Sequence, residues 1–373
     1  MEHWIKYWSD NHEVIIITDL YESSKNLNFN SNIKIFEMKG ILNYFIKKFK
    51  IRSKFWNYLN KLSSIINYSI FISKIASIER VDFVHAHSLY YGAICFNVKK
   101  NIPVIFTPMG SDIIMYAQKS LIHRLLAYLA YKRSNVVTGD SILLQKKGLL
   151  VGASIKNNYI IQNGVDSKIF YPAQDKRAEL FKLCNSTTII FSPRSLSKLY
   201  NIKTIIDSIY ILKHRNIMIH CVLTYAVGDD YVTKLKNYAK EKEIDENLTW
   251  LGYLNHTQMA EVFNSSDIIV SVPSSDSSPK SVYEAMFCKK PVILSDLTWT
   301  YEFFKEPNYF LRVEPCNSVS LADSIEHYIN NPKTRALHSE NCYMKVIEKF
   351  DYYKNMKNLE NILFTFKKNP VNE

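Results

Sequence analysis

Glycine is scarce in this 373-residue chain, and none of its nine glycines belongs to a phosphate-binding motif. No three of them can be read as G-x-G-x-x-G, and no G-x-x-x-x-G-K-[ST] is present. The first pattern binds dinucleotides, and the second binds the phosphates of nucleoside triphosphates. We therefore exclude a dehydrogenase with the usual fingerprint and a P-loop enzyme.

Cysteine pairs and long apolar runs are also lacking. The six cysteines are far apart and include no C-x-x-C, which excludes a zinc ribbon and indicates the reduced thiols of a cytosolic protein. No run reaches the ~18 uncharged apolar residues of a spanning helix, so we expect no integral membrane protein. The first residues lack the apolar core of a secretory signal, and we expect none.

Charge is present but unevenly distributed. Residues 1–165 hold 21 Lys and Arg against 10 Asp and Glu, whereas the remaining 208 residues hold 26 against 25. Almost the whole net charge of +12 therefore belongs to the first half. Such an imbalance indicates an anionic partner for that half, which can be a membrane surface, a nucleic acid or an acidic substrate.

Short apolar runs alternate with helix-length amphipathic stretches along the chain, as is typical of βαβ units with a parallel sheet. Strands are predicted over 12–18, 33–37, 83–86, 104–107, 135–138, 159–161, 187–192, 218–224, 248–251, 268–272 and 291–295. Helices are predicted between them, notably over 41–59, 121–132, 202–213, 231–242, 257–264 and 281–287. The chain opens directly on a helix, without the strand that normally begins a doubly wound domain.

This alternation predicts an α/β protein with two doubly wound, Rossmann-like domains. The Asn-Gly-Val-Asp turn over 163–166 marks the boundary. We place the N-terminal domain at 1–165 and the C-terminal domain at 166–350. Residues 351–373 are predicted to be a helix that packs back on the first domain.

The strongest motif is S-V-P-S-S-D-S-S-P-K-S-V-Y-E-A-M over 271–286. Pro279 suits a first helical position, with Ser277 or Ser278 as the N-cap. The start of such a helix binds anions through its free N–H groups and dipole. Glu284 can then accept hydrogen bonds from vicinal hydroxyls such as those of a ribose, with Asp276 beside the group attached to the phosphate.

Taken alone, Lys280 and Glu284 would be an ordinary surface ion pair. The spacing from Asp276 to Glu284, however, resembles the E-x7-E region of family 4 retaining glycosyltransferases of the GT-B architecture. Other segments are similar to that family in the same order, and the set covers roughly residues 12–365: V-H-A-H over 84–87, V-I-F-T-P-M-G-S-D-I over 104–113, I-Q-N-G-V-D over 161–166 and S-P-R-S-L over 192–196.

The resemblance implies two domains that face each other across a cleft, with the first strand of the N-terminal domain missing. It also implies that the donor lies on the second domain, where Glu284 binds the ribose, Asp276 the sugar and Arg194 the diphosphate. A guanidinium suits phosphate because it binds two oxygens at once and keeps its charge. The other donor-binding candidates are Lys198, Ser278, Lys280 and Ser281.

Further roles are implied for the first domain. The catalytic candidates, besides Asp276, are His87 and Asp112. The candidates for the acceptor side of the cleft are His85, Gly110, Ser111 and Asn163. The transfer is expected to need no metal and no cofactor, with a nucleotide-sugar, favoured as a UDP-sugar, as the co-substrate.

Four positions depart from the family pattern. Asp276 stands where Glu is usual, which shortens the side chain by one methylene. Tyr200-Asn201 stands where Lys-Gly is commoner. Met109 replaces the histidine that precedes Gly-Ser-Asp in the first domain.

The segment F-I-K-K-F-K-I-R-S-K-F-W over 45–56 mixes cations with aromatic and aliphatic side chains. At helical spacing it fits an interfacial helix on anionic lipid, and a solvated helix with Phe and Trp on the core is the plain alternative. The candidates for membrane contact are Lys47, Lys48, Lys50, Arg52, Lys54 and Trp56. No nucleic-acid motif accompanies them, so we expect no nucleic-acid partner.

Together these features predict a retaining, hexosyltransferase-like enzyme in surface polysaccharide or lipopolysaccharide synthesis. Its acceptor is expected to be a glycan or a lipid-linked molecule, and its location the cytoplasm, peripherally on the inner face of the cell membrane. Two alternatives stay open. One is a nucleotide-sugar epimerase or hydrolase of the same architecture, and the other is a non-catalytic donor-binding subunit.

Overall fold

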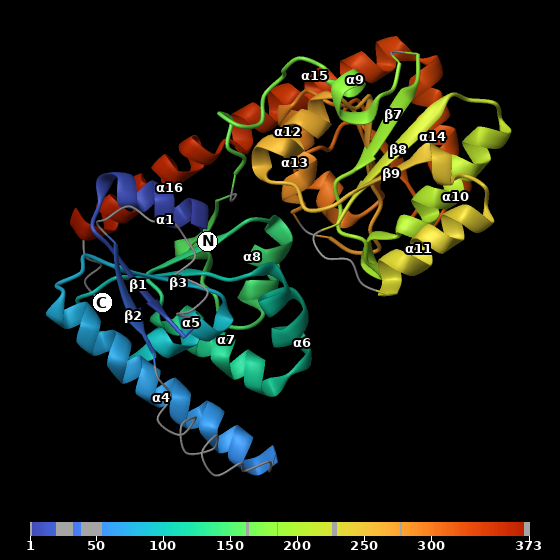
Figure 1. The fold of residues 1–373 in the computed structure, drawn as a ribbon. Helices are drawn as coiled ribbons and strands as arrows, with labels where there is room; N and C mark the ends of the chain where they lie inside the picture. Colours follow the sequence, from blue (N-terminus) through green and yellow to red (C-terminus); the bar gives the residue numbers. More distant parts are fainter. Residues whose placement is uncertain are drawn as a thin grey trace. The chain divides into compact units, whose positions relative to one another are not determined.

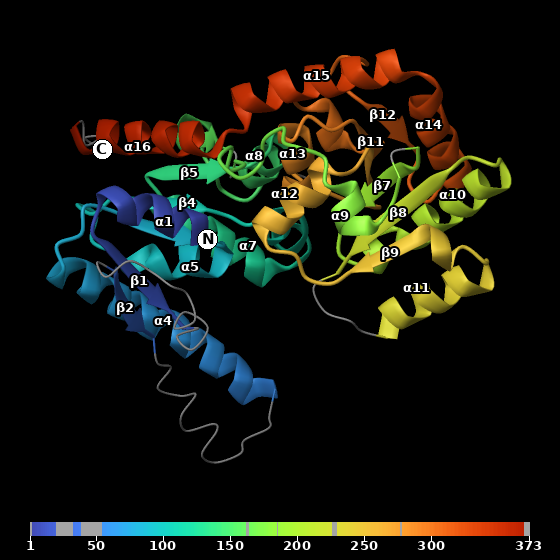
Figure 2. The same ribbon diagram turned by 45° about the horizontal axis from the view of Figure 1, so that its top comes forward.

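A computed structural model of the chain describes residues 2–19, 33–38, 54–161, 164–184, 186–225, 230–276 and 278–368. Its contacts divide the chain into two compact units. Unit 1 comprises Met1–Ile161 with Met356–Glu373, and unit 2 comprises Gln162–Asn355. Each unit is built on parallel β-sheet covered by helices (Figure 1, Figure 2).

The described strands of unit 1 form two parallel sheets. β1 (Val14–Thr18) pairs with β2 (Ile33–Glu37), and the other sheet has the order β3-β4-β5-β6. Its strands are β3 (Val84–His87), β4 (Val104–Thr107), β5 (Val136–Gly139) and β6 (Asn158–Ile160). Every residue of β4 and β5 is buried, as expected for central strands covered on both faces.

The helices of unit 1 begin with α1, which confirms that the chain opens on a helix. They are α1 (Glu2–Asn11), α4 (Lys54–Ile78), α5 (Leu89–Ile94), α6 (Ala117–Lys119), α7 (Leu121–Arg133), α8 (Ile142–Leu149) and α16 (Tyr352–Lys368), with short turns η1 (Cys95–Asn97), η2 (Asp112–Tyr116) and η3 (Ile155–Asn157). α16 begins in unit 2 and ends against α1, where Glu360 accepts hydrogen bonds from Tyr7 and His12, each at 3.1 Å.

Unit 2 has a single parallel sheet with the order β12-β11-β10-β7-β8-β9. Its strands are β7 (Thr188–Ser192), β8 (Ile219–Thr224), β9 (Leu248–Leu251), β10 (Ile268–Ser271), β11 (Val292–Ser295) and β12 (Leu311–Val313). The chain starts in the middle at β7, adds strands on one side, and returns to add β10 on the other side of β7. The strand order therefore reverses between β7 and β10.

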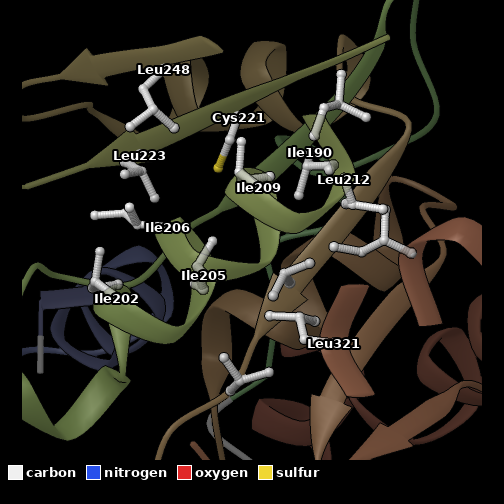
Figure 3. Close-up of a cluster of buried hydrophobic side chains, with 14 of the residues drawn as sticks. Ile190, Ile202, Ile205, Ile206, Ile209, Leu212, Cys221, Leu223, Leu248 and Leu321 are labelled. Atoms are coloured by element: carbon white, nitrogen blue, oxygen red, sulfur yellow. The ribbon is translucent and has the colours of Figure 1, made fainter. Parts of the chain in front are cut away.

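Helices cover both faces of this sheet (Figure 1). They are α9 (Arg177–Phe181), α10 (Ile202–His214), α11 (Asp230–Glu241), α12 (His256–Asn264), α13 (Lys280–Phe287), α14 (Ser318–Asn330) and α15 (Pro332–Lys349), with the turns η4 (Lys198–Tyr200), η5 (Asp245–Asn247) and η6 (Thr298–Tyr301). α10 buries an apolar stripe at positions 202, 205, 206, 209 and 212 against the sheet (Figure 3). This spacing of three and four residues is that of one helix face.

Most predicted elements agree with the structure, and three strands (33–37, 104–107 and 248–251) have the predicted bounds. The short edge strand β12 was missed because three residues give no measurable alternation. Of the helix predicted over 41–59, residues 41–53 lie outside the described residues. α4 continues to Ile78, well beyond the predicted end, because no glycine or proline interrupts 54–78.

Gly164 occupies a position that only glycine fits without strain. Its φ is +73°, and a Cβ there would lie 2.5 Å from the Cα of Tyr352. The two segments touch because Val165 N donates to Phe350 O at 2.8 Å and Tyr352 N donates to Val165 O at 3.0 Å. Backbone contact on this side of residue 164 leaves no space for a side chain.

We therefore expect Gly164→Ala to lower the free energy of unfolding by about 2 kcal/mol, since it combines a left-handed alanine with a backbone clash. Urea denaturation measures the change. Gly252→Ala is the control, because a Cβ at Gly252 meets nothing within 4 Å. Equal stability of the two variants would contradict the assignment.

Candidate active site

The loops that follow β7 and β10 meet at the reversal of the strand order in unit 2. Arg194, just after β7, donates from Nη2 to Asp276 Oδ2 at 2.8 Å, and from Nη1 to Ser281 Oγ at 3.3 Å. Asp276 lies in the loop after β10, and Ser281 is in the first turn of α13. In open parallel sheets, ligands bind beyond the carboxyl ends of the strands at such a reversal. The structure thus brings together three of the predicted site residues.

Tyr200 and Asn201, which stand where Lys-Gly is commoner in the family, both make contacts near the loop that follows β7. The guanidinium of Arg194 lies 4.2 Å from the centre of the Tyr200 ring, a cation–π distance. Asn201 has a φ of 51°, a conformation that asparagine tolerates better than most residues. Its amide donates to Val272 O and to Ser274 Oγ, each at 2.9 Å, which ties the two loops together. Sequence reasoning missed both contacts.

The start of α13 differs from the prediction. Helical structure begins at Lys280, and Pro279 is itself the N-cap, without a side-chain capping bond in the described residues. The predicted cap by Ser277 or Ser278 is therefore wrong, and Ser277 lies outside the described residues; Ser278 is half-buried. Because proline has no side-chain acceptor, the N-cap Pro279 does not itself cap the first N–H groups of α13, and the start of a helix of this kind binds anions.

Glu284 is buried, with only 6% of its surface exposed. Burial raises the pKa of its carboxyl from an ordinary 4.5 to about 7, and the nearby charge of Lys280 opposes this rise. Lys280 Nζ lies 3.9 Å from Glu284 Oε1, which is too far for a hydrogen bond. The two residues therefore form the ion pair weighed for them, at a long distance, but its carboxylate is buried and does not lie on the surface. A buried carboxyl of raised pKa is instead typical of a functional site.

In unit 1, the predicted residues His85 and His87 lie together at the end of β3. Their rings stack at 4.1 Å, and Trp4 of α1 presents its edge to both. His85 Nε2 is 2.8 Å from Thr107 Oγ1. Burial lowers the pKa of both imidazoles, that of His87 to about 4, so both are neutral at pH 7. Sequence analysis had not singled out Trp4 for this role.

The remaining candidates of unit 1 are placed less directly. Asp112 Oδ2 accepts a hydrogen bond from the backbone N–H of Leu89 at 2.8 Å, which holds the start of α5. Gly110 and Ser111 form the helical turn that leads into η2. Asn163 lies outside the described residues. In unit 2, Lys198 is exposed at the start of η4.

The described part of the chain holds no group of three or more His, Cys, Asp or Glu side chains arranged for a metal ion. None of its helices is long and apolar enough to cross a membrane. Of the predicted membrane segment, only Lys54 and Trp56 lie in a described helix; Lys47, Lys48, Lys50 and Arg52 are outside the described residues.

The sequence model of the family "Glycosyl transferases group 1" matches residues 174–344, a range that includes Arg194, Asp276 and Glu284. Residues 174–344 are a group 1 glycosyltransferase domain. The chain is accordingly a glycosyltransferase, and the predicted family is confirmed at that level. This chain is also 25% identical to an uncharacterized glycosyltransferase of Methanocaldococcus jannaschii. The similarity extends over 286 residues, which are 75% of this chain and 74% of the relative.

Solved structures with similar folds cover nearly the whole chain. Anabaena HepE, crystallised in complex with UDP and glucose, has a TM-score of 0.75 at 15% identity, over 98% of this chain and 94% of HepE. The sucrose-phosphate synthase of Thermosynechococcus elongatus has a TM-score of 0.77 at 14% identity, over 98% and 92%. A glycosyltransferase of Rickettsia africae has a TM-score of 0.73 at 17% identity, over 100% of this chain and 94% of the Rickettsia chain. The likeness shows the GT-B fold, with two Rossmann-like domains, as predicted.

The raised pKa of Glu284 predicts a pH-dependent stability. A carboxyl whose pKa is higher in the folded state contributes fully below its ordinary pKa of 4.5, and this contribution is lost as the pH rises through about 7. Glu284→Gln keeps the neutral form at every pH. Relative to this variant, we expect the wild type to lose about 2–3 kcal/mol of unfolding free energy between roughly pH 5 and pH 8. Urea denaturation at both pH values tests this, and a constant difference would contradict it.

Proposed function

We propose that the chain is a retaining glycosyltransferase that moves a sugar from a nucleotide-sugar to a glycan or lipid-linked acceptor in surface polysaccharide or lipopolysaccharide synthesis. The observation that carries this proposal is the meeting of Arg194, Asp276 and the start of α13 where the strand order reverses, with Glu284 buried in the same helix. The UDP and glucose bound by HepE, which has the same fold, support a UDP-sugar as the donor.

The proposed donor site assigns one task to each group. The ribose hydroxyls donate to Glu284, whose carboxylate accepts strongly once it is ionised. The diphosphate lies between Arg194 and the first N–H groups of α13, with Lys198 and Lys280 as further cations. The sugar lies beside Asp276. Each contact matches the chemistry of the group it receives.

Donor binding then exchanges partners at Arg194. In the structure its guanidinium is paired with Asp276, and the side chains of the two residues are only 11% and 15% exposed. A diphosphate that binds the guanidinium replaces this carboxylate, which releases Asp276 to the sugar hydroxyls. Tyr200 keeps the guanidinium plane in place during the exchange, because the ring contact does not involve its N–H groups.

In a retaining transfer of this type, the acceptor oxygen attacks the anomeric carbon on the face from which the diphosphate leaves. The bond to the diphosphate breaks as the new glycosidic bond forms, and the acceptor proton passes to the departing phosphate. Cations and N–H groups already aimed at that phosphate stabilise the developing charge without reorganisation.

The proposal assigns the acceptor to unit 1, with His85, His87, Gly110, Ser111 and Asn163 as candidate contacts. Neutral imidazoles suit a carbohydrate, since each ring can donate and accept a hydrogen bond. An anionic membrane partner accounts for the basic balance of residues 1–165. Peripheral attachment to the inner face of the cell membrane and the segment 45–56 as one contact remain part of this proposal.

The proposed exchange predicts that substitutions of Arg194 and of Asp276 affect UDP affinity differently. We expect Arg194→Ala to weaken UDP binding by about 10- to 100-fold, the loss of a charge-assisted contact. Asp276→Asn should bind UDP at least as tightly as the wild type, because the competing anion is gone, while transfer from the UDP-sugar falls at least about tenfold. Isothermal titration calorimetry and a radiolabelled transfer assay measure these effects.

Lys203→Ala is the matched control, since Lys203 is an exposed cation with its own ion pair to Asp207 at 3.1 Å. It should change neither UDP affinity nor transfer. Loss of UDP affinity in Asp276→Asn would contradict the exchange, and wild-type affinity in Arg194→Ala would contradict the donor site itself. A released free or isomerised sugar, instead of a glycosylated acceptor, would favour a hydrolase or epimerase.

Metal removal provides a further prediction. Because Arg194, the neighbouring lysines and the start of α13 supply positive charge for the diphosphate, we expect transfer to continue in excess EDTA at a rate within about twofold of the untreated enzyme. Loss of activity that Mg²⁺ or Mn²⁺ restores would contradict this account of leaving-group stabilisation.

A further inference from the structure

The outer face of α7 in unit 1 is apolar, which is the reverse of the usual surface helix. Leu121 is 83% exposed, Leu125 59% and Tyr128 49%. These residues are four and three apart, so they lie along one face. The opposite face holds the buried Ala127, Ala130 and Tyr131, so α7 is packed on the core by its small residues and presents its large ones outward.

Residues after α8 continue this surface. Leu121, Leu125 and Tyr128 line a shallow groove together with residues 150–152. Within it, Leu150 is 59% exposed, and Arg124 donates from Nη2 to Leu150 O at 3.4 Å. We call this surface, formed by Leu121, Leu125, Tyr128 and Leu150, the α7 face.

The segment that carries the α7 face holds almost only positive charge. Between 113 and 161 the sequence holds seven Lys and Arg and one acidic residue, Asp140. Lys119 and Lys132 are exposed at the two ends of α7. In the described part of the chain, no ion pair neutralises either of them.

An exposed apolar surface of this kind marks an interaction site. A protein partner of ordinary composition would not require a cation at each end of the face. An anionic bilayer does match both features, because leucine and tyrosine enter the headgroup region while lysine and arginine meet the phosphates. We propose that the α7 face docks on anionic lipid and holds unit 1 against the membrane that carries the acceptor.

This proposal rests on the proposed function for the lipid-linked acceptor, but its site is separate from segment 45–56. Anchoring by two separate contacts is stronger than by either alone, because the second contact forms within one molecule. It also predicts that glycosylation of a lipid-borne acceptor depends on the α7 face, whereas UDP binding by unit 2 does not.

The experiment is sedimentation of the full chain with phosphatidylcholine vesicles, with and without one third phosphatidylglycerol, at low and high salt. We expect binding only to the anionic vesicles and only at low salt. Leu121→Ser with Leu125→Ser should lower the partition coefficient at least about tenfold, and Lys119→Ser with Lys132→Ser by about fivefold for each cation.

The matched control is Leu337→Ser with Met344→Ser on α15 of unit 2, where the side chains are 52% and 56% exposed. It should bind vesicles as the wild type does. A second variant with Ser at positions 47, 48, 50, 52 and 54 separates the two contacts. Hydrogen exchange of the wild type should show protection of 121–132 upon vesicle binding, and thermal melting confirms that each variant is folded.

Vesicle binding that survives the leucine substitutions, or a lack of protection over 121–132, would overturn the proposal. Self-association abolished by those substitutions, without vesicle binding, would show that a second copy of the chain covers the face instead. Failure of the proposed function is distinguishable from either result, because it appears as a loss of UDP binding or of transfer to a soluble acceptor.

Discussion

The parallel sheet of unit 2 brings distant parts of the sequence together at a single place. Because the strand order reverses between β7 and β10, the loops that leave these two strands have no strand between them. Arg194 and Asp276, 82 positions apart, therefore form an ion pair. The helix that follows the second loop, α13, begins at the same point and carries Ser281 and Glu284. The described donor-site contacts all depend on this reversal.

The electrostatics of the site follow from how much water each group has lost. Arg194 has a carboxylate, a hydroxyl and an aromatic ring as neighbours, so its charge is compensated although it is largely buried. Glu284 is buried with a cation at 3.9 Å, and burial makes its carboxyl resist ionisation more than the cation favours it. The carboxylate of Asp276 is thus paired with a cation, whereas burial disfavours the ionised form of Glu284.

Much of this arrangement could be predicted from the sequence, because strand ends and loop residues are local features. The runs before Arg194 and Asp276 identify β7 and β10, and the spacing to Glu284 identifies α13. The contacts of Asn201 and Trp4 could not be predicted, since each joins segments that are far apart in the chain. The contact of Tyr200 with Arg194 is local, but it depends on the path of the loop after β7, which the sequence pattern does not specify. The prediction of a serine N-cap for α13 was wrong because Pro279 has an extended backbone, with ψ of 100°, and is itself the N-cap. Both histidines of β3 were predicted, but not the burial that keeps them neutral.

The parallel bridge between Val165 and Asp351 places the two ends of unit 2 next to each other. Unit 1 is interrupted after Ile161 and resumes at Met356, so unit 2 is an insertion within it. An insertion with adjacent ends imposes little strain on the domain that hosts it, whatever its length. In evolutionary terms, recombination at these two neighbouring points can replace unit 2 as a whole while the fold of unit 1 is kept.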